Sequence, residues 1–145
     1  MDLCLFAERG CRAKLGSAES VVFLAAPCAP EVQERVGAVI AAAEDVGLQC
    51  LVAERNQEFN RDVFCEKICR PVIESRFCVV LLDRSRQKED ETPSFNPNVL
   101  YEYGLMSALR KTVLAFTPEG QDIPFNVRHL DLIPYAERKL RALAK

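Results

Sequence analysis

The residue whose chemistry stands out in this sequence is Glu102, which lies in an otherwise nearly apolar stretch, FNPNVLYEYGLMSALRKTVL, running from residue 95 to 114. Asn96 suits the N-cap of a helix and Pro97 its first position, so we expect a helix to begin there. On a helical wheel Glu102 falls among apolar neighbours. A carboxylate in that position must be paired, hydrogen-bonded or lining a cleft whose ligand needs it, and partial desolvation should raise its pKa.

A carboxylate beside a cleft suits a reaction in which positive charge develops on the substrate. Cleavage of an N-glycosidic bond is such a reaction, because an oxocarbenium-like centre forms at the sugar and a carboxylate stabilises or traps it. Glu102 is therefore the candidate catalytic residue. The structural alternative is a buried helix carboxylate satisfied by Arg76 or Arg128. The chain has one histidine, His129, which argues against imidazole acid–base chemistry and a histidine-rich metal centre.

Alternating apolar runs and amphipathic stretches indicate the elements that position Glu102. Short, continuously apolar runs are typical of strands buried on both faces. Strands are expected at 21–26, 48–53, 77–82 and 112–116, with a weaker one at 129–135, and helices at 30–46, 61–74 (interrupted by Pro71) and 136–145. Alternating strands and helices imply right-handed βαβ units and a mostly parallel, open α/β sheet.

Ligands of such sheets bind outside the carboxyl ends of the strands, where the Glu102 helix also begins. Polar and small residues follow the expected strands at this edge. The expected substrate-binding residues are Pro27, Asp83, Ser85, Asn96, Asn98 and Tyr101. Asp83 and Asn98 would hold sugar hydroxyls, and Tyr101, Tyr103 or Phe95 would face a base or nicotinamide ring. Turn formation by Asp83 and helix capping by Asn98 remain the structural alternatives.

Residues 83–94, DRSRQKEDETPS, form a charged segment between the third strand and the Glu102 helix. A long polar connection next to a ligand edge is either a lid over the site or a solvated loop. The sequence leaves both open.

Length and charge restrict the class of protein. A chain of 145 residues fits one domain at 21–145 behind an N-terminal extension at 1–20. A net charge of −2 with scattered basic residues gives no footprint for nucleic acid or an anionic membrane, so the partner should be a small molecule or a protein. No run approaches the ~20 apolar residues of a membrane helix, and the expected location is the cytoplasm.

Seven cysteines are present, and most are expected to be reduced and used as small hydrophobic residues, as in the apolar runs around Cys50 and Cys78. A zinc site formed by four thiolates is the alternative. It would use Cys4, Cys11, Cys65 and Cys69, but neither pair has the tight CxxC spacing, so no metal is expected.

The segment NPNVLYEYGLMSALRKTVL, with RFCVVLLD before it and IPFNVRHLDLIPY after it, resembles the bacterial TIR-like and nucleoside 2-deoxyribosyltransferase-like proteins. Their signature block is strand–loop–(N/D)xNVxxExG–helix–strand. The resemblance covers about Val21 to Tyr135. It implies a flavodoxin-like (TIR-like) sheet of about five strands with helices on both faces, and Glu102 as the catalytic residue. Asp83 matches the acidic residue after the third strand, and Asn98 the polar residue one turn before the glutamate.

The resemblance implies one of two activities. One branch hydrolyses NAD to nicotinamide and ADP-ribose, often in anti-phage defence, with NAD as substrate and no cofactor. In the other, the glutamate is the nucleophile of nucleoside deoxyribosyl transfer or hydrolysis. The resemblance also implies self-association or a separate sensor or activator protein. A non-catalytic nucleotide-binding or oligomerising module of the same fold remains the alternative, because fold does not fix function.

Overall fold

The computed structural model describes residues 11–53, 61–86, 88–128 and 130–136. Its centre is a five-stranded sheet in the order β2-β1-β3-β6-β7, with every neighbouring pair parallel. The strands are β1 (Ala18–Ala25), β2 (Gln49–Val52), β3 (Ser75–Leu81), β6 (Val113–Pro118) and β7 (Leu132–Tyr135). The expected flavodoxin-like α/β fold is therefore confirmed.

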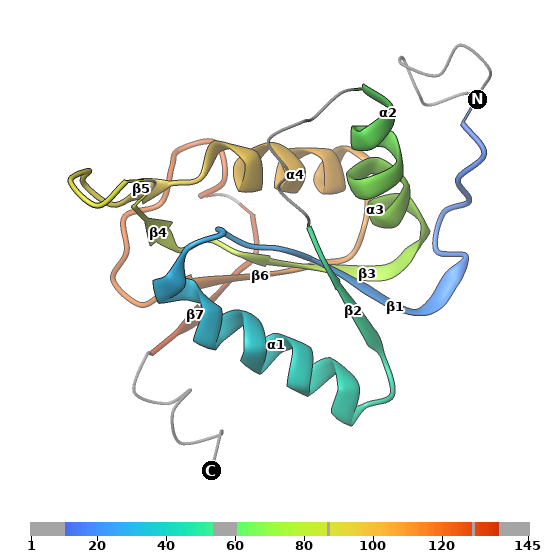
Figure 1. Cartoon of the computed structure of the whole chain (residues 1–145), viewed down its shortest axis with the longest axis horizontal. Helices are drawn as coiled ribbons and strands as arrows, with labels where there is room; N and C mark the ends of the chain where they lie inside the picture. The colour runs from blue at the N-terminus through green and yellow to red at the C-terminus, as the bar shows by residue number, and fades with distance from the viewer. Residues whose placement is uncertain (1–10, 54–60, 87, 129, 137–145) are drawn as a thin grey trace.

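Helices cover both faces of this sheet, as Figure 1 shows. One face carries α1 (Gln33–Asp45), and the opposite face carries α2 (Arg61–Phe64), α3 (Arg70–Glu74) and α4 (Pro97–Ala108). Side chains alternate along each strand between two cores. Leu24 and Leu81 belong to the core beneath α1, whereas Phe23 and Val80 belong to the core beneath α3 and α4. Both sides of the central strands are thus covered, which explains their continuously apolar sequence.

The predicted helix at 30–46 is present and ends as its sequence suggests. A 3-10 turn at Pro30–Val32 leads into α1. Gly47 follows the helix with φ +75°, and the N–H of Leu48 donates to the carbonyl of Ala43 at 2.9 Å. A residue with positive φ at this position closes the last turn, and glycine adopts it without a Cβ penalty.

The predicted interruption at Pro71 takes the form of a change in helix type. Between α2 and α3 lies a π-helical turn, Cys65–Cys69, and Pro71 sits in the first turn of α3. Proline has no N–H for the regular helical ladder, and a wider turn ahead of it is one way for the backbone to continue. The helical segment therefore stays continuous from α2 to α3.

Several strand boundaries differ from expectation by one to three residues, and one element was not expected. The strand β1 begins at Ala18 rather than Val21, and β7 covers only the second half of the predicted 129–135 segment. The segment expected as an unbroken loop contains a short antiparallel pair, β4 (Arg84–Ser85) and β5 (Ser94–Phe95). Two-residue strands carry no readable periodicity, so this element was missed. Residues 137–145 of the expected terminal helix lie outside the described part of the chain.

No helix in the described ranges is both long and apolar enough to cross a membrane. Six of the seven cysteines lie in these ranges and all six are free thiols. Cys78 is buried in β3, and Cys50 is half-buried in β2, in agreement with their expected use as small hydrophobic residues. Burial raises the pKa of both thiols, with a further contribution from Glu44 at Cys50.

Candidate functional site

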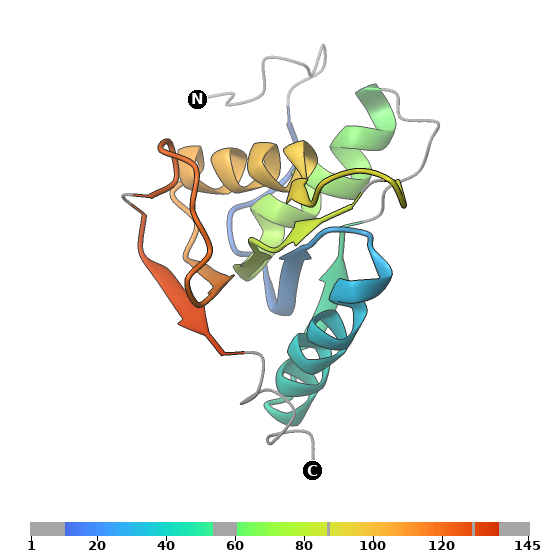
Figure 2. The same cartoon turned by 90° about the vertical axis from the view of Figure 1, so that its left-hand side faces the viewer.

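The carboxyl ends of the strands and the start of α4 gather at one edge of the molecule, which faces the viewer in Figure 2. The short strands β4 and β5 lie at this edge and lead directly into α4. The topology therefore brings together the segments in which the sequence placed its candidate residues.

The start of α4 is fixed by Asn96. Its backbone is extended (φ −71°, ψ 119°), and its Oδ1 accepts hydrogen bonds from the backbone N–H groups of Asn98 at 2.9 Å and Val99 at 3.4 Å. Pro97 follows in the first turn, as expected. The alternative in which Asn98 caps the helix is wrong, because Asn96 supplies the cap. The Asn98 side chain is exposed and plays no part in it.

Glu102 lies in the second turn of α4 and is only 4% exposed. The apolar residues around it on this helix, Val99 and Met106, belong to the core beneath α4. Asn98 lies one turn before Glu102 on the same side of the helix, and residues at this spacing have neighbouring side chains. The expectation that Glu102 lies among apolar residues of a helix is thus confirmed, and its catalytic role stays a prediction.

The two arginines suggested as structural partners of Glu102 are located elsewhere or otherwise engaged. The guanidinium of Arg128 pairs with the Asp122 carboxylate at 3.0 Å. Arg76 is exposed near the beginning of β3, the end opposite to the start of α4. Neither residue supplies the partner that a purely structural role for Glu102 was expected to use.

Asp83 follows β3 and its side chain is 1% exposed. Its Oδ1 lies 2.6 Å from Nε of Arg35 on α1 and accepts a hydrogen bond from the Tyr135 hydroxyl at 2.5 Å. The Arg35 guanidinium also lies 6.0 Å from the centroid of the Tyr135 ring. Asp83 is therefore directed to the α1 side of the sheet, whereas Glu102 packs on the other side. A direct contact of Asp83 with a sugar stays a prediction, and its observed partners give it a structural role.

The remaining candidates differ in exposure. Pro27 is fully buried, and Ser85 is 3% exposed in β4, opposite Ser94. Tyr101 is 58% exposed and packs edge-on against Phe64, with 5.9 Å between the ring centroids. Of these residues, Tyr101 offers an accessible aromatic face at the helix start. Contact with substrate stays a prediction for each of them.

Arg35 and Tyr135 were not identified from the sequence as residues of this edge. Arg35 had a readable signal, because it interrupts the apolar stripe of α1 between Val32 and Val36. Tyr135 had none, since an aromatic residue at the end of a strand is ordinary. Residues 54–60, which follow β2 in the sequence, lie outside the described residues, as does His129.

A metal centre finds no support in the ranges that the structure covers, which contain no group of three or more histidine, cysteine or acidic side chains placed to hold an ion. Cys65 and Cys69 lie in the π-helical turn, and Cys11 precedes β1. Cys4, the fourth member of the possible thiolate site, is outside the described residues.

Comparison with known proteins gives structural relatives only. No protein-family model and no curated protein sequence matches the chain. Among solved structures, the chain is similar to the CMP N-glycosidase BcmB of Clostridium botulinum, with a TM-score of 0.59 and 20% identity over 86% of this chain and 97% of that chain. It is also similar to the TIR domain of the Toll-related receptor TRR-2 from Hydra magnipapillata, with a TM-score of 0.56 and 17% identity over 84% of this chain and 89% of that chain. At these identities the likeness establishes the fold, which is the TIR-like, flavodoxin-like α/β fold common to both.

Proposed function

We propose that this protein hydrolyses the N-glycosidic bond of a nucleotide, with NAD as the first candidate substrate and Glu102 as the catalytic residue. The observation that carries the proposal is the placement of Glu102, a nearly buried carboxylate in the second turn of α4 at the carboxyl edge of a parallel sheet. Ligands of such sheets bind at this edge. The fold likeness to a CMP N-glycosidase supports the same reaction class.

In the proposed reaction the bond between the anomeric carbon and the nicotinamide nitrogen breaks, and both electrons stay with the nitrogen. Nicotinamide leaves as a neutral molecule, so no general acid is required. The Glu102 carboxylate stabilises the positive charge that develops on the sugar, an effect that is large in a site with little water. Water then adds to the anomeric carbon and releases one proton, giving ADP-ribose.

Asn98 and Tyr101 would bind the substrate near Glu102. The exposed amide of Asn98 lies one turn before Glu102 and can exchange hydrogen bonds with ribose hydroxyls. The exposed Tyr101 ring lies on the neighbouring side of the helix and would stack on the base.

The resemblance supports further proposals about the setting of this activity. The protein acts in the cytoplasm as an antiviral effector. It self-associates and is activated by a separate sensor or activator protein.

A nucleoside or nucleoside monophosphate is the second candidate substrate, because a similar solved structure is a CMP N-glycosidase. Cytosine is a poorer leaving group than nicotinamide, since the cytosine ring of CMP carries no positive charge and needs a proton to leave as a neutral molecule. Deoxyribosyl transfer to a second base would use the same carboxylate as nucleophile. A non-catalytic nucleotide-binding module remains the contrasting hypothesis, and the fold likeness to a receptor domain favours it.

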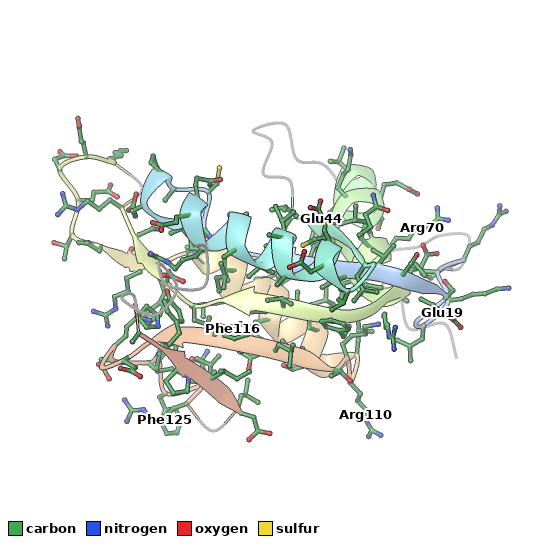
Figure 3. The ribbon with its side chains drawn as sticks, turned by 90° about the horizontal axis from the view of Figure 1, so that it is seen from below. Glu19, Glu44, Arg70, Arg110, Phe116 and Phe125 are labelled. Carbon is green, nitrogen blue, oxygen red and sulfur yellow. The ribbon has the colours of Figure 1, made fainter. Side chains whose placement is uncertain are left out.

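The test measures base release by chromatography after incubation with NAD, CMP or deoxynucleosides, at low and at high protein concentration. The matched pair of variants is Glu102→Gln and Glu19→Gln. Glu19 is exposed near the beginning of β1, at the end of the sheet opposite to the candidate site. In Figure 3 it lies at the opposite end of the molecule from Phe125, which is in the loop after the carboxyl end of β6. We expect release by the wild type and by Glu19→Gln, and a loss of at least about 100-fold in Glu102→Gln.

Thermal unfolding of each variant shows whether Glu102→Gln remains folded. Unchanged release in folded Glu102→Gln would remove Glu102 from the mechanism. Nucleotide binding without release by the wild type at any concentration would favour the non-catalytic module.

A further inference from the structure

The parallel ladder between β3 and β6 meets a proline at the edge where the candidate site lies. The last regular pair is Leu81 with Phe116, and the N–H of Leu82 donates to the Phe116 carbonyl at 2.8 Å. In a continuing parallel ladder, residue 118 would come opposite Asp83, donate its N–H to the Leu82 carbonyl and accept from the N–H of Arg84. Residue 118 is proline, which has no N–H to donate.

The side-chain amide of Gln121 occupies this missing position. Its Nε2 donates to the Leu82 carbonyl at 2.5 Å, and its Oε1 accepts from the N–H of Arg84 at 3.1 Å. The same Nε2 lies 3.1 Å from Oγ1 of Thr117 as a second acceptor. These are the two hydrogen bonds that the N–H and the carbonyl of residue 118 would have made on either side of Asp83. One side chain thus extends the ladder by one pair.

A tight turn places Gln121 where it can do this. The backbone N–H of Gln121 donates to the Pro118 carbonyl at 3.3 Å, and Gly120 has φ +76°, a conformation that glycine adopts without strain. The Pro118 carbonyl is therefore used by the turn, and the Arg84 N–H has Gln121 as its partner. Gln121 is half-buried, so water competes less for these bonds.

Arg84 connects the backbone that Gln121 holds to the residues that precede α4. Its guanidinium donates to the Asp122 carbonyl at 3.2 Å and lies 5.0 Å from the centroid of the Phe95 ring. Arg84 and Phe95 are also paired across β4 and β5. Phe95 directly precedes Asn96, the N-cap of α4. A continuous set of contacts therefore runs from Gln121 through Arg84 and Phe95 to the start of the helix that carries Glu102.

We propose that Gln121 is a positioning residue for the reaction, and this proposal rests on the proposed function. Gln121 makes the two hydrogen bonds, to the Leu82 carbonyl and from the Arg84 N–H, that residue 118 would make in a continuing ladder, and so it fixes the backbone on both sides of Asp83. Through Arg84 and Phe95 it fixes the start of α4 and so the location of Glu102. Displacements of about 1 Å at a catalytic group lower rates by up to ~100-fold, which makes such a restraint consequential for turnover.

The test compares three variants. Gln121→Met has a similar length and no hydrogen bonds, and Gln49→Met is the control, because Gln49 is exposed on the edge strand β2. Gln121→Glu is the conservative variant. Its carboxyl group donates to the Leu82 carbonyl when protonated and has no proton to donate when ionised.

We expect the Arg84 amide proton, followed by NMR, to exchange at least about 10-fold faster in Gln121→Met than in the wild type or Gln49→Met. For base release, kcat should fall about 10- to 100-fold in Gln121→Met at every pH. In Gln121→Glu, the ratio of kcat to that of the wild type at the same pH should approach 1 at low pH and fall as the pH rises through the pKa of the new carboxyl group. A loss of packing alone would not give this pH-dependent recovery.

Two results overturn the proposal. One is unchanged Arg84 exchange in folded Gln121→Met, which would show that the amide does not restrain this segment. The other is faster exchange with unchanged kcat, which would show that the restraint does not reach Glu102. A wild type that releases no base from any substrate overturns the proposed function instead. In that case the pKa of the Glu102 carboxyl, measured by ¹³C NMR titration, tests the Gln121 proposal. A different pKa in Gln121→Met supports the proposal, and the same pKa in the wild type and in Gln121→Met overturns it.

Discussion

Asp83 and Arg35 form an ion pair in which Nε of Arg35 lies 2.6 Å from Oδ1 of Asp83. The pair joins α1 to the carboxyl end of the central strand β3. Tyr135 donates to the same carboxylate oxygen from β7, the outermost strand on the other side of β6. A single buried carboxylate thus connects one helix and two strands at the edge where the candidate site lies.

We expect Asp83→Asn to destabilise the protein strongly. Asparagine keeps the size of the side chain but removes the negative charge 2.6 Å from Nε of the largely buried Arg35. Breaking a buried pair in this way costs about 3 kcal/mol. Urea unfolding measures the change. The control is Asp122→Asn, because Asp122 and Arg128 form an exposed pair whose loss should change stability by less than about 0.5 kcal/mol. Equal effects in the two variants would contradict the structural role of Asp83.

Tyr135→Phe should cost about 1 to 2 kcal/mol of unfolding free energy. The substitution removes only the hydroxyl that donates to Asp83 and keeps the ring beneath Arg35. Tyr101→Phe is the matched control, because Tyr101 is 58% exposed and its loss of a hydroxyl should be nearly neutral. In a double-mutant cycle with Asp83→Asn the two changes should not be additive. Additive effects would mean that the two side chains do not interact in solution.

Asn96 and Asn98 should separate stability from activity. Asn96→Ala removes the side-chain oxygen that accepts hydrogen bonds from two backbone N–H groups, which should lower the unfolding free energy by about 1 kcal/mol. Asn98→Ala should change the unfolding free energy by less than about 0.5 kcal/mol, since its side chain is exposed and outside the cap. Under the proposed function, Asn98→Ala should instead raise KM for the nucleotide. Wild-type kinetics in Asn98→Ala would remove this residue from the substrate contacts.

Arg110→Gly should stabilise the protein by about 1 kcal/mol. Arg110 follows α4 with φ +53°, and the N–H of Lys111 donates to the Met106 carbonyl at 3.0 Å, so the arginine occupies a position that favours glycine. The reciprocal change, Gly47→Ala after α1, should destabilise by a similar amount. Thermal and urea unfolding of both variants measure the effects. The same sign in both would refute the conformational explanation.

Stability should fall at alkaline pH, in part because of Cys78. Burial raises the pKa of this thiol above its ordinary value, so the unfolded chain loses the proton at a lower pH than the folded chain. Its contribution is present below the ordinary thiol pKa and is lost as the pH rises through the raised one. Burial acts in the same direction on Tyr103, and desolvation lowers the pKa of Lys111, which acts in the opposite direction at higher pH.

The measurement is urea unfolding between about pH 7.5 and 9.5, around the ordinary thiol pKa. Cys78→Ala should be less stable than the wild type at pH 7.5, but its stability should fall less steeply with rising pH. A slope identical to that of the wild type would exclude Cys78 as a source of the alkaline loss.

The strands were predictable because both faces of the sheet are covered. A short, continuously apolar run such as FCVVLL is typical of a strand buried on both sides, and β3 was found there, beginning two residues earlier. The short pair β4 and β5 was not predictable, since Arg84 and Phe95 are brought together by the packing of the segment and not by any repeat in it.

Local spacing alone determined the helix of the candidate site. The Asn96 cap, the proline after it and the burial of Glu102 all depend on residues within two helical turns of one another, so they could be read from the sequence. Only the tertiary structure decided that Asp83 turns toward Arg35 and Tyr135, and that Gln121 replaces the missing N–H of Pro118. These partners are distant in the chain and meet because strand order and register place them together, which no local pattern specifies.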